Sequence, residues 1–358
     1  MMLSKEEQVQ YSRHILLNEI GVKGQLKLKE AKVLVIGAGG LGCPILQYLT
    51  AAGVGTLGII DDDVVDQTNL QRQILYTLDD VGKPKVEVAV KRLARLNPFV
   101  QFQIFKDKLT IKNALSLFKA FDIIVDGSDN FQTRYLCNDA AVITNKPLVY
   151  GSIFKFEGQV SVFNFNGSGT YRCLYPTPPK PDTSPNCSDI GVMGVLPGII
   201  GSLQANEVIK IICGLKGVLV NKLLVFDVLS MRQIILSFSK TDESNILILE
   251  EDYNFFCGIE SVDQDILIDE LLKNTSDYNL LDVRETSERE QYDIGGLHIP
   301  LSQLPERYHE ISTNKPLVVY CKSGTRSKKA ILFLRDVLLN TILINLRNGL
   351  PAKFLIKN

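Results

Sequence analysis

Three features of this sequence contain residue types that are able to do chemistry. A glycine-rich stretch, GAGGLG, spans Gly37 to Gly42 directly after an apolar run. Cys187 lies in a proline-rich stretch, and Cys321 is followed by the polar segment KSGTR. Glycines in such a loop let backbone N–H groups approach a phosphate, and a thiolate is a strong nucleophile. A nucleotide loop and two thiols on one chain suggest activation followed by transfer, with a thiol being charged with sulfur.

Alternating strands and helices are predicted around the glycine loop. Residues 32 to 129 contain the apolar runs KVLVIG, TLGIID, FQIF and FDIIVDGSD, with helical patterns from Leu41 to Ala52 and around KPKVEVAVKRLARL. This alternation predicts an α/β fold with a doubly wound, Rossmann-like, mainly parallel sheet. The later runs PLVYGS, EGQVSVFNF and KLLVFDV predict further strands, with the helix-like LPGIIGSLQANEVIKIICG among them. We expect the last two of these strands to form an antiparallel, hairpin-like extension.

Polar segments divide the chain into two expected domains. SKTDESN and EEDYN mark a boundary near residues 240 to 262, and a smaller α/β pattern follows in YNLLDVRE, PLVVYCKSG, a helix from Ser327 to Leu339, and TILINLRNG. We therefore expect one domain over residues 1–250 and a second over 262–358. Residues 171–191 hold five prolines, too many for a helix or strand, and predict a mobile crossover loop.

Composition and charge argue against several classes of partner. The 358 residues include 39 basic and 40 acidic side chains, and a net charge of -1 gives no overall field to attract nucleic acid or an anionic membrane. The amino terminus MMLSKEEQVQ lacks the apolar stretch of a signal peptide. The odd number of cysteines, seven, is typical of a reducing compartment rather than a disulfide framework. We expect a cytoplasmic protein without nucleic-acid or membrane partners.

Charged side chains follow the strands around the glycine loop. Asp61 ends the second strand, where a carboxylate accepts hydrogen bonds from ribose hydroxyls, so an NAD-dependent oxidoreductase is one alternative. Asn69 and Arg72 in NLQRQ, Lys85, and Asp129 in DGSDN instead suit a triphosphate with Mg²⁺. Taken singly, Lys85 also fits a solvated lysine at a helix start. Asp126 and Asn130 also fit turn formers.

Seven motifs together resemble the MoeB/ThiF/HesA adenylyltransferases, bacterial relatives of ubiquitin-activating enzymes. They are YSRHILL, GAGGLG, DDD, NLQRQ, GKPKVE, DGSDN and YPTPPKPDTSPNCSDIGVMG, and the match covers about residues 5 to 257. The resemblance implies that ATP is bound and that Asp129 places a Mg²⁺ ion. The cofactor-binding residues that it implies are Gly37, Gly39, Gly40, Gly42, Asp61, Asp63, Asn69, Arg72, Lys85, Asp129 and Asn130.

The resemblance also implies a reaction and two kinds of partner. In this family the substrate is a MoaD- or ThiS-like sulfur carrier of ubiquitin fold. The carboxylate of its terminal glycine becomes an acyl-adenylate. Lys85, Arg72 and Mg²⁺ would stabilise charge that develops on the phosphates. Arg13 resembles the arginine that such enzymes supply across a dimer to the partner subunit's triphosphate, which implies a homodimer; without the resemblance, Arg13 is a surface residue.

Different observations suggest a functional role for each of the two thiols. Cys187 matches the loop cysteine of the eukaryotic two-domain members of the family, which attacks the adenylate or resolves a persulfide; otherwise a lone cysteine is more often an inert core residue. Cys321 follows a buried strand, and the segment through Ser327 curves back so that N–H groups converge on sulfur, an arrangement that lowers a thiol pKa and stabilises a persulfide anion.

The segment around Cys321 resembles a rhodanese domain over residues 262 to 358. The resemblance rests on LLDVRE, GGLHIPL and CKSGTR, and Asp282 and Arg284 match the family's strand motif. Four residues separate Cys321 from Arg326, whereas phosphate-binding tyrosine phosphatase loops need five, which favours sulfur over phosphate. The family implies a cysteine desulfurase as the sulfur donor.

Two departures from these families stand out. Many adenylyltransferase relatives hold a structural zinc with two CxxC pairs, but here only Cys173 and Cys257 of the four expected ligands remain, so we expect no zinc and two neighbouring relics. Near the carboxyl terminus, Asn348 and Lys353 stand where rhodaneses usually have glycine and tryptophan. Sulfur transfer is then expected to be slower or more specialised.

The favoured hypothesis is an ATP-dependent adenylyltransferase that activates a carrier's glycine and transfers sulfur from a Cys321 persulfide, in molybdopterin biosynthesis. Activation of a ThiS-like carrier for thiamine thiazole synthesis is the alternative within the family. Outside it stand the NAD-dependent oxidoreductase and a non-catalytic scaffold with a dead nucleotide fold.

Overall fold

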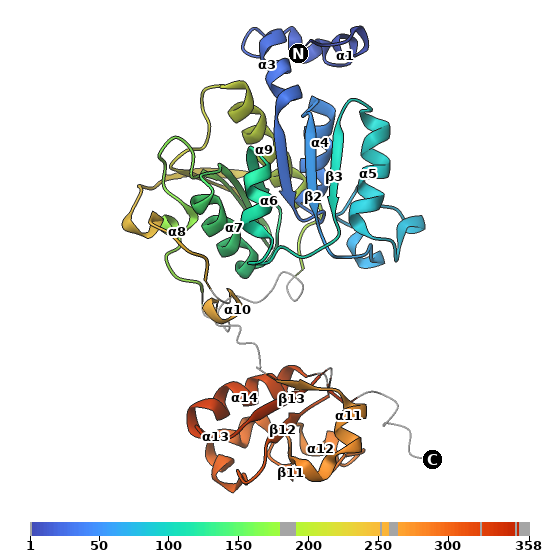
Figure 1. Ribbon diagram of the computed structural model, residues 1–358, viewed down its shortest axis with the longest axis vertical. Helices are drawn as coiled ribbons and strands as arrows, with labels where there is room; N and C mark the ends of the chain where they lie inside the picture. Colours follow the sequence, from blue (N-terminus) through green and yellow to red (C-terminus); the bar gives the residue numbers. More distant parts are fainter. Residues whose placement is uncertain are drawn as a thin grey trace. The chain divides into compact units, whose positions relative to one another are not determined.

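The chain forms two compact units, residues 1–258 and 259–358, in a computed structural model (Figure 1). The structure describes residues 2–179, 191–250, 253–257, 264–322, 324–347 and 349–350. Cys187, Asn348 and Lys353 lie outside the described residues, so the sequence-based predictions for them stay predictions.

An eight-stranded sheet forms the centre of the first unit, in the order β3-β2-β1-β4-β5-β6-β7-β8. The first five strands along the chain pair in parallel, and the last three are antiparallel to their neighbours. The strands are β1 (Lys32–Ile36), β2 (Thr56–Ile60), β3 (Gln101–Phe105), β4 (Ile123–Asp126), β5 (Leu148–Phe154), β6 (Glu157–Phe163), β7 (Lys222–Asp227) and β8 (Arg232–Ser237). The predicted α/β fold with a parallel sheet and an antiparallel extension is confirmed.

Helices cover both faces of this sheet. On β1, Val33 and Val35 join one hydrophobic cluster with α4, α5 and α9, whereas Leu34 and Ile36 join a second cluster with α6 and α7. Alternate side chains of a strand point to opposite faces, so the four apolar residues 33–36 of β1 are buried on both sides of the sheet. The helices are α1 (Lys5–Gln10), α2 (Ser12–Ile15), α3 (Gly21–Glu30), α4 (Gly42–Ala52), α5 (Lys85–Leu96), α6 (Ala114–Ala120), α7 (Phe131–Ile143), α8 (Tyr171–Leu174), α9 (Val195–Cys213) and α10 (Tyr253–Phe256).

The antiparallel extension differs from the expected hairpin. β6 and β7 do pair antiparallel, but α8 and α9 lie between them in the chain. The tight turns instead join β5 to β6 and β7 to β8. β8 was missed because its sequence, RQIILS, is mostly exposed at the sheet edge and lacks the clear apolar run of the inner strands.

The proline-rich crossover also contains a helix that was not expected. Tyr171–Leu174 forms the single turn α8, ahead of the first of the prolines. Tyr171 is buried in the second cluster, and its backbone N–H donates to Asn138 on α7. Tertiary packing therefore stabilises a turn whose local composition disfavours it.

The long apolar helix α9 packs inside the first unit. It contacts α3, α4, β5 and β6, and residues such as Leu196, Ile200 and Val208 are buried. Within the described residues it is one helix whose length and composition would also allow a membrane crossing. A buried core helix meets the same criterion, so this observation is weak evidence for a membrane span.

The second unit is a smaller parallel α/β structure. Its five strands have the order β11-β10-β12-β13-β9 and all pair in parallel. The helix predicted from Ser327 to Leu339 begins and ends two residues earlier. The strands are β9 (Asp265–Ile266), β10 (Asn279–Asp282), β11 (Leu297–His298), β12 (Leu317–Tyr320) and β13 (Leu343–Leu346); the helices are α11 (Ile268–Lys273), α12 (Thr286–Arg289), α13 (Leu304–Arg307) and α14 (Thr325–Val337).

Candidate active sites

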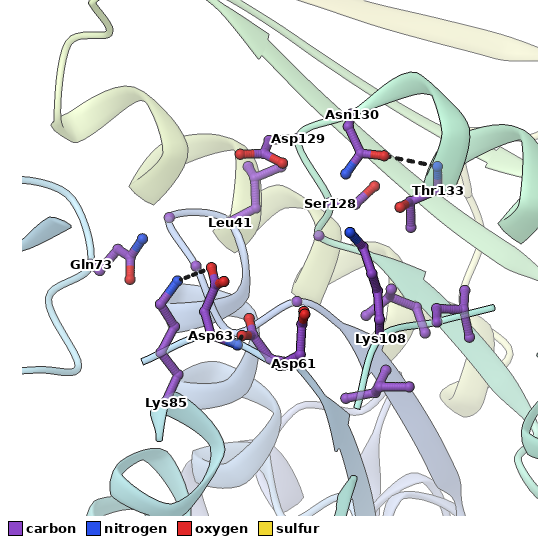
Figure 2. A pocket seen from close by; sticks show the side chains of 18 of the residues that line it. Leu41, Asp61, Asp63, Gln73, Lys85, Lys108, Ser128, Asp129, Asn130 and Thr133 are labelled. Atoms are coloured by element: carbon purple, nitrogen blue, oxygen red, sulfur yellow. Dashed lines mark hydrogen bonds and ion pairs between the residues drawn. The ribbon is translucent and has the colours of Figure 1, made fainter. Parts of the chain in front are cut away.

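A cavity of about 350 Å³ lies at the carboxyl ends of the parallel strands of the first unit. Residues that follow β1, β2, β3 and β4 line it, as expected for a doubly wound sheet, where ligands bind beyond these strand ends. The predicted site residues on its wall are Gly37, Gly39, Gly40, Asp61, Asp63, Arg72, Lys85, Asp129 and Asn130. Figure 2 shows the carboxylates of Asp61, Asp63 and Asp129 and the ammonium group of Lys85 around this space.

The glycine loop is possible only because two of its positions lack a side chain. Gly37 has a φ of +89°, a left-handed conformation that favours glycine. A Cβ at Gly42, the first residue of α4, would lie 2.1 Å from the Gly37 carbonyl oxygen. Gly42 therefore does not line the cavity; it lets α4 pack directly against the end of β1.

Asp61 holds the glycine loop from the adjacent strand. Its Oδ2 accepts a hydrogen bond of 2.7 Å from the Ala38 N–H, and its Oδ1 accepts one of 2.8 Å from the Asp63 N–H. Burial raises the pKa of this carboxyl, and the Ala38 N–H and Lys85 oppose that rise. A carboxylate in this position fixes the loop and still has lone pairs for a ribose hydroxyl.

Lys85 is buried beside the cavity. It is the first residue of α5, but its side chain is only 5% exposed and its Nζ lies 2.7 Å from Asp63 Oδ2 (Figure 2). The alternative of a solvated lysine at a helix start is therefore wrong. A desolvated ammonium group stabilises phosphate charge more strongly than one in water.

Residues of the DGSDN segment have two roles: some stabilise the local backbone, and others line the cavity. Asp126 is fully buried, and its Oδ1 accepts hydrogen bonds from the N–H and the hydroxyl of Ser128, so it shapes the turn, as one of the alternatives held. Burial raises its pKa. Asn130 caps α7, because its Oδ1 accepts the Thr133 N–H at 2.9 Å (Figure 2). Asp129 sits between them on the cavity wall.

The NLQRQ segment contributes unequally. Arg72 lines the cavity while its Nη1 donates to the Thr68 carbonyl at 3.2 Å. Asn69 is not among the described residues of the wall; its Oδ1 accepts the Asp66 N–H at 3.3 Å and closes a short 3₁₀ turn. The structure thus places Arg72, but not Asn69, on the wall of the cavity.

Arg13 is not among the described residues that line the cavity. It is an exposed residue of α2, which lies in sequence between α1 and α3. In Figure 1 these helices pack near the amino end of β1, opposite the carboxyl end that borders the cavity. Arg13 is therefore not brought to the cavity of its own subunit.

Lys108, Gln73 and Thr133 are among the cavity residues that the sequence analysis did not name. Lys108 follows β3, Gln73 follows Arg72, and Thr133 lies in the first turn of α7 (Figure 2). Gln73 is buried, and within the described residues its Oε1 has no hydrogen-bond partner, as befits a group that faces a ligand. The rule that ligands bind beyond parallel strand ends would have identified Lys108.

The second candidate site surrounds Cys321 in the other unit. The thiol is fully buried at the end of β12. The N–H groups of Gly324 and Ser327 point to its Sγ at 3.2 and 3.4 Å, and Gly324 has a φ of +89° that turns the chain into α14. Converging backbone donors favour a sulfur anion over a neutral thiol. The predicted curl of KSGT and Ser327 back onto sulfur is what the described part of the loop adopts.

Charged pairs support the Cys321 loop. The Arg326 guanidinium forms two hydrogen bonds to Glu288, of 2.6 and 2.7 Å, which lower the pKa of Glu288 to about 2. Asp282 and Arg284, the residues of the strand motif, form a buried ion pair of 2.7 Å, and Arg284 also donates to the Glu288 carbonyl of α12. Their role is therefore to hold β10 and α12 in place rather than to touch a substrate.

The two cysteines of the expected zinc remnant have different contacts among the described residues, and whether they are neighbours stays a prediction. The Cys173 sulfur accepts N–H bonds from Thr170 and Thr241, at 3.3 Å each. Cys257 is buried in the second hydrophobic cluster, and burial raises the pKa of its thiol to about 12. Arg172 lies between these segments and forms hydrogen bonds of 2.8 and 2.6 Å to the buried Asp139.

The amino-acid sequence matches two family models, one over each unit. The ThiF family model matches residues 11–245, and the rhodanese-like domain model matches residues 267–352. The chain belongs to the ThiF family. It is an adenylyltransferase with a fused rhodanese domain, and thus also a sulfurtransferase.

Similar proteins agree with this assignment. The chain is 41% identical to "Probable adenylyltransferase/sulfurtransferase MoeZ" of Mycobacterium tuberculosis, over 98% of this chain and 93% of that protein. It is 40% identical to "Probable molybdopterin-synthase adenylyltransferase" of Porphyra purpurea, over 93% of this chain and 89% of that protein. The "Sulfur carrier protein adenylyltransferase" of Thermus thermophilus is 46% identical and aligns over its whole length with 72% of this chain. Membership of this family decides against the NAD-dependent oxidoreductase.

Proposed function

We propose that the enzyme adenylates the terminal glycine of a MoaD-like sulfur carrier and then converts it to a thiocarboxylate, in molybdopterin biosynthesis. The observation that carries the proposal is the presence of two loops on one chain: a nucleotide loop beside a cavity that Arg72 and Lys85 line, and a loop whose N–H groups point to the Cys321 sulfur. The name of the Porphyra relative supports the pathway, and that of the Thermus relative supports a sulfur carrier as substrate.

Adenylation begins with ATP in the cavity of the first unit. The loop amides after β1 hold the phosphates, and Asp61 accepts the ribose hydroxyls while it braces the loop. The carrier's carboxylate attacks the α-phosphorus, pyrophosphate leaves, and an acyl-adenylate forms. Arg72 and Lys85 stabilise the charge that develops on the phosphates. The step turns a poor electrophile into an acyl group with a good leaving group.

A divalent cation fits the same cavity. Asp61, Asp62 and Asp63 have carboxylate oxygens within 4.8 Å of one another, and Asp129 faces the same space. Oxygen ligands of this kind suit Mg²⁺, which would neutralise phosphate charge. Because Lys85 already pairs with Asp63, Asp129 is the residue that we propose for the metal.

Sulfur transfer uses a persulfide on Cys321. A cysteine desulfurase would load it. The persulfide's terminal sulfur attacks the acyl carbon of the adenylate, AMP leaves, and an acyl persulfide joins the carrier to Cys321. The Cys187 thiol then attacks the Cys321 sulfur, which forms a Cys187–Cys321 disulfide and releases the carrier thiocarboxylate with a proton. An external dithiol must reduce that disulfide before the next cycle.

The active unit would be a homodimer in the cytoplasm. Arg13 is exposed and is not among the described residues that line its own cavity, which is compatible with a role at the triphosphate of another subunit. Mixing two inactive variants, Arg13→Ala and Lys85→Ala, tests this: sharing of sites would restore about a quarter of the activity in a 1:1 mixture, because one site of each mixed dimer is intact, whereas no recovery would contradict the trans arrangement.

The first unit would be held together without zinc. The positions of the missing ligands are Thr170 and Asn254, and a site of four cysteine ligands needs four thiolates. Arg172 instead links α8 to Asp139 on α7, and Tyr253 of α10 donates to the same Asp139 at 2.6 Å. This ionic clamp joins the segments that two CxxC pairs would otherwise join.

The clamp is open to a direct stability test. Asp139→Asn removes the buried ion-pair partner of Arg172 and leaves it only the more exposed Glu250 as an ion-pair partner among the described residues, so the free energy of unfolding should fall by about 3 kcal/mol. Glu250→Gln is the matched control: Glu250 contacts the same Arg172 but is 41% exposed, and its loss should cost less than about 1 kcal/mol. Stoichiometric zinc in protein purified without chelator, measured by plasma mass spectrometry, would contradict the clamp's role.

The proposed function is tested by ATP–pyrophosphate exchange with purified MoaD-like and ThiS-like carriers, each with and without its terminal glycine. Exchange that depends on the MoaD-like glycine is the expected result. Dependence on the ThiS-like glycine would move the enzyme to thiamine thiazole synthesis. No exchange with either carrier, under conditions where a relative is active, would contradict the proposal that the enzyme adenylates these carriers.

A further inference from the structure

A buried polar chain runs away from the sulfur of Cys321. The Ser327 hydroxyl lies 3.5 Å from the Cys321 Sγ and donates to Asn345 Oδ1 at 2.7 Å. The Asn345 Nδ2 donates in turn to Asp265 Oδ1 at 2.8 Å. Ser327 and Asn345 are both fully buried, whereas Asp265 lies on β9 at the edge of the sheet.

The direction of this chain follows from the chemistry of its ends. A carboxylate only accepts hydrogen bonds, so the amide NH₂ group of Asn345 must face Asp265. The amide oxygen must then face Ser327. β9 and β13 fix this geometry, because Asn345 and Asp265 are direct partners in the parallel strand register.

Ser327 has a single hydroxyl proton and several acceptors around it. The Asn345 oxygen is the nearest at 2.7 Å, the Gly324 carbonyl oxygen lies at 3.0 Å, and the sulfur is farthest at 3.5 Å. While the proton is on the Asn345 side, the hydroxyl turns a lone pair toward the sulfur. The sulfur anion then receives backbone N–H groups but not this hydroxyl.

We propose that Asn345, oriented by Asp265, is a positioning residue that withholds the Ser327 proton from the sulfur of Cys321. The inference rests on the proposed function in taking Cys321 as the sulfur-carrying residue. A sulfur anion that is stabilised by fewer donors is more basic and a stronger nucleophile. The N–H groups of the loop thus stabilise the sulfur anion, and Asn345 prevents the Ser327 hydroxyl from adding a further hydrogen bond to it.

Other charges around the loop stay constant in the Asn345 and Ser327 variants. Arg326 on α14 interacts electrostatically with Cys321 and is held by Glu288 from α12. Lys322 follows the thiol and is exposed, and Arg347 contacts the outer oxygen of Asp265 at 3.2 Å. Substitutions at Asn345 or Ser327 leave all four of these groups in place.

The test is the pH dependence of iodoacetamide alkylation at Cys321 in the full-length protein, followed by mass spectrometry of the Cys321 peptide. Asn345→Leu should lower the midpoint by about 0.5 to 1 pH unit, because the freed hydroxyl turns to the thiolate. Ser327→Ala alone should change it little. In the Asn345→Leu, Ser327→Ala double variant the lowering should disappear, a coupling that a merely structural role would not produce.

Two further variants keep the outcome decisive. Asp265→Asn retains the buried Asn345 but removes the fixed orientation of its amide, and should give a smaller lowering of the midpoint. Arg347→Gln, at the exposed end of the chain, should give none. An unchanged or raised midpoint in Asn345→Leu and Asp265→Asn, or a lowering that persists without the Ser327 hydroxyl, would overturn the proposal. Because alkylation needs no carrier or ATP, its result is independent of the exchange assay.

Discussion

The two loops of this enzyme use one structural device for ligands of very different size. In each, a buried parallel strand ends, a glycine with a φ of +89° turns the chain, and a helix begins: Gly37 before α4 and Gly324 before α14. The first loop borders a cavity of about 350 Å³, whereas the second closes on one fully buried sulfur atom. Strand, turn and helix start therefore specify an anion site, and the surrounding side chains decide its size.

In both loops, the nearby cationic side chain is ion-paired with a carboxylate. Lys85 pairs with Asp63, and Arg326 pairs with Glu288. Each pairing keeps a positive charge beside the anion site while it fixes where that charge lies. The difference is burial: the Lys85 side chain is 5% exposed, whereas Arg326 is 30% exposed, so we expect the charge at the nucleotide loop to matter more.

The largest expected effect separates the functions of the two loops. Cys321→Ala should reduce thiocarboxylate formation at least 1000-fold, roughly the loss when a covalent nucleophile is removed, and leave ATP–pyrophosphate exchange unchanged. Both rates are measured on the same preparation. Cys173→Ala, which removes a half-buried thiol of the first unit, is the control and should retain both activities. Loss of exchange in Cys321→Ala would contradict the assignment of adenylation and sulfur transfer to separate loops.

The converse change targets the nucleotide loop. Lys85→Ala removes the buried ammonium group and should lower kcat/KM for exchange about 100- to 1000-fold, the range seen when one preorganised charge-stabilising group is lost. Alkylation of Cys321 should be unchanged. Lys83→Ala is the matched control, since Lys83 lies two residues earlier and is exposed; a similar loss there would show that general charge, not the buried site, is responsible.

Close packing at the nucleotide loop predicts a smaller effect. A Cβ at Gly42 would lie 2.1 Å from the Gly37 carbonyl oxygen, so Gly42→Ala must displace α4 or the loop. We expect a loss of about 1–3 kcal/mol in unfolding free energy and a raised KM for ATP. Gly198→Ala on α9 is the control, because its Cβ would meet nothing within 4 Å. Equal denaturation midpoints for the two variants would contradict the packing argument.

The smallest expected effect concerns the paired cation at the sulfur loop. Arg326 lowers the pKa of Glu288 from 4.5 to about 2, so the pair's contribution to stability is fully present above pH 4.5 and is lost as the pH falls toward 2. Glu288→Gln should cost about 1–2 kcal/mol at pH 7, where the pair is partly screened by solvent. Denaturant unfolding from pH 7 to 3 should show this difference shrinking, whereas Glu290→Gln, nearby and exposed, should show none.

Sequence patterns predicted the strands and helices best where both faces are buried. The apolar runs at 33–36, 57–60 and 123–125 lie in β1, β2 and β4, and the structure places all three strands in the parallel sheet. The exposed edge strand β8 and the single-turn helix α8 were missed, since packing against neighbours, not local composition, stabilises them.

The candidate site divides in the same way. Glycine spacing and charged residues after the strands indicated the nucleotide loop, and CKSGTR indicated the sulfur loop. Residue types alone did not separate Asp126, the last residue of β4, which shapes a turn, from Asp129, three residues later, which lines the cavity. The family resemblance was what assigned Asp129 to the metal. The sequence analysis also assigned no role to Asn345, which lies 24 positions from Cys321 and reaches it only through Ser327.

The sequence by itself determined that this chain has two α/β domains, one with a nucleotide loop and one with a thiol at a strand end. These features depend on local spacing, on glycine conformation and on which faces are apolar. Only the tertiary structure decided that Lys85 is buried against Asp63, that Arg172 and Asp139 form a clamp, and that Asn345 accepts a hydrogen bond from the Ser327 hydroxyl. Each of those depends on which strands and helices become neighbours, because desolvation and hydrogen-bond direction are set by contacts distant in sequence.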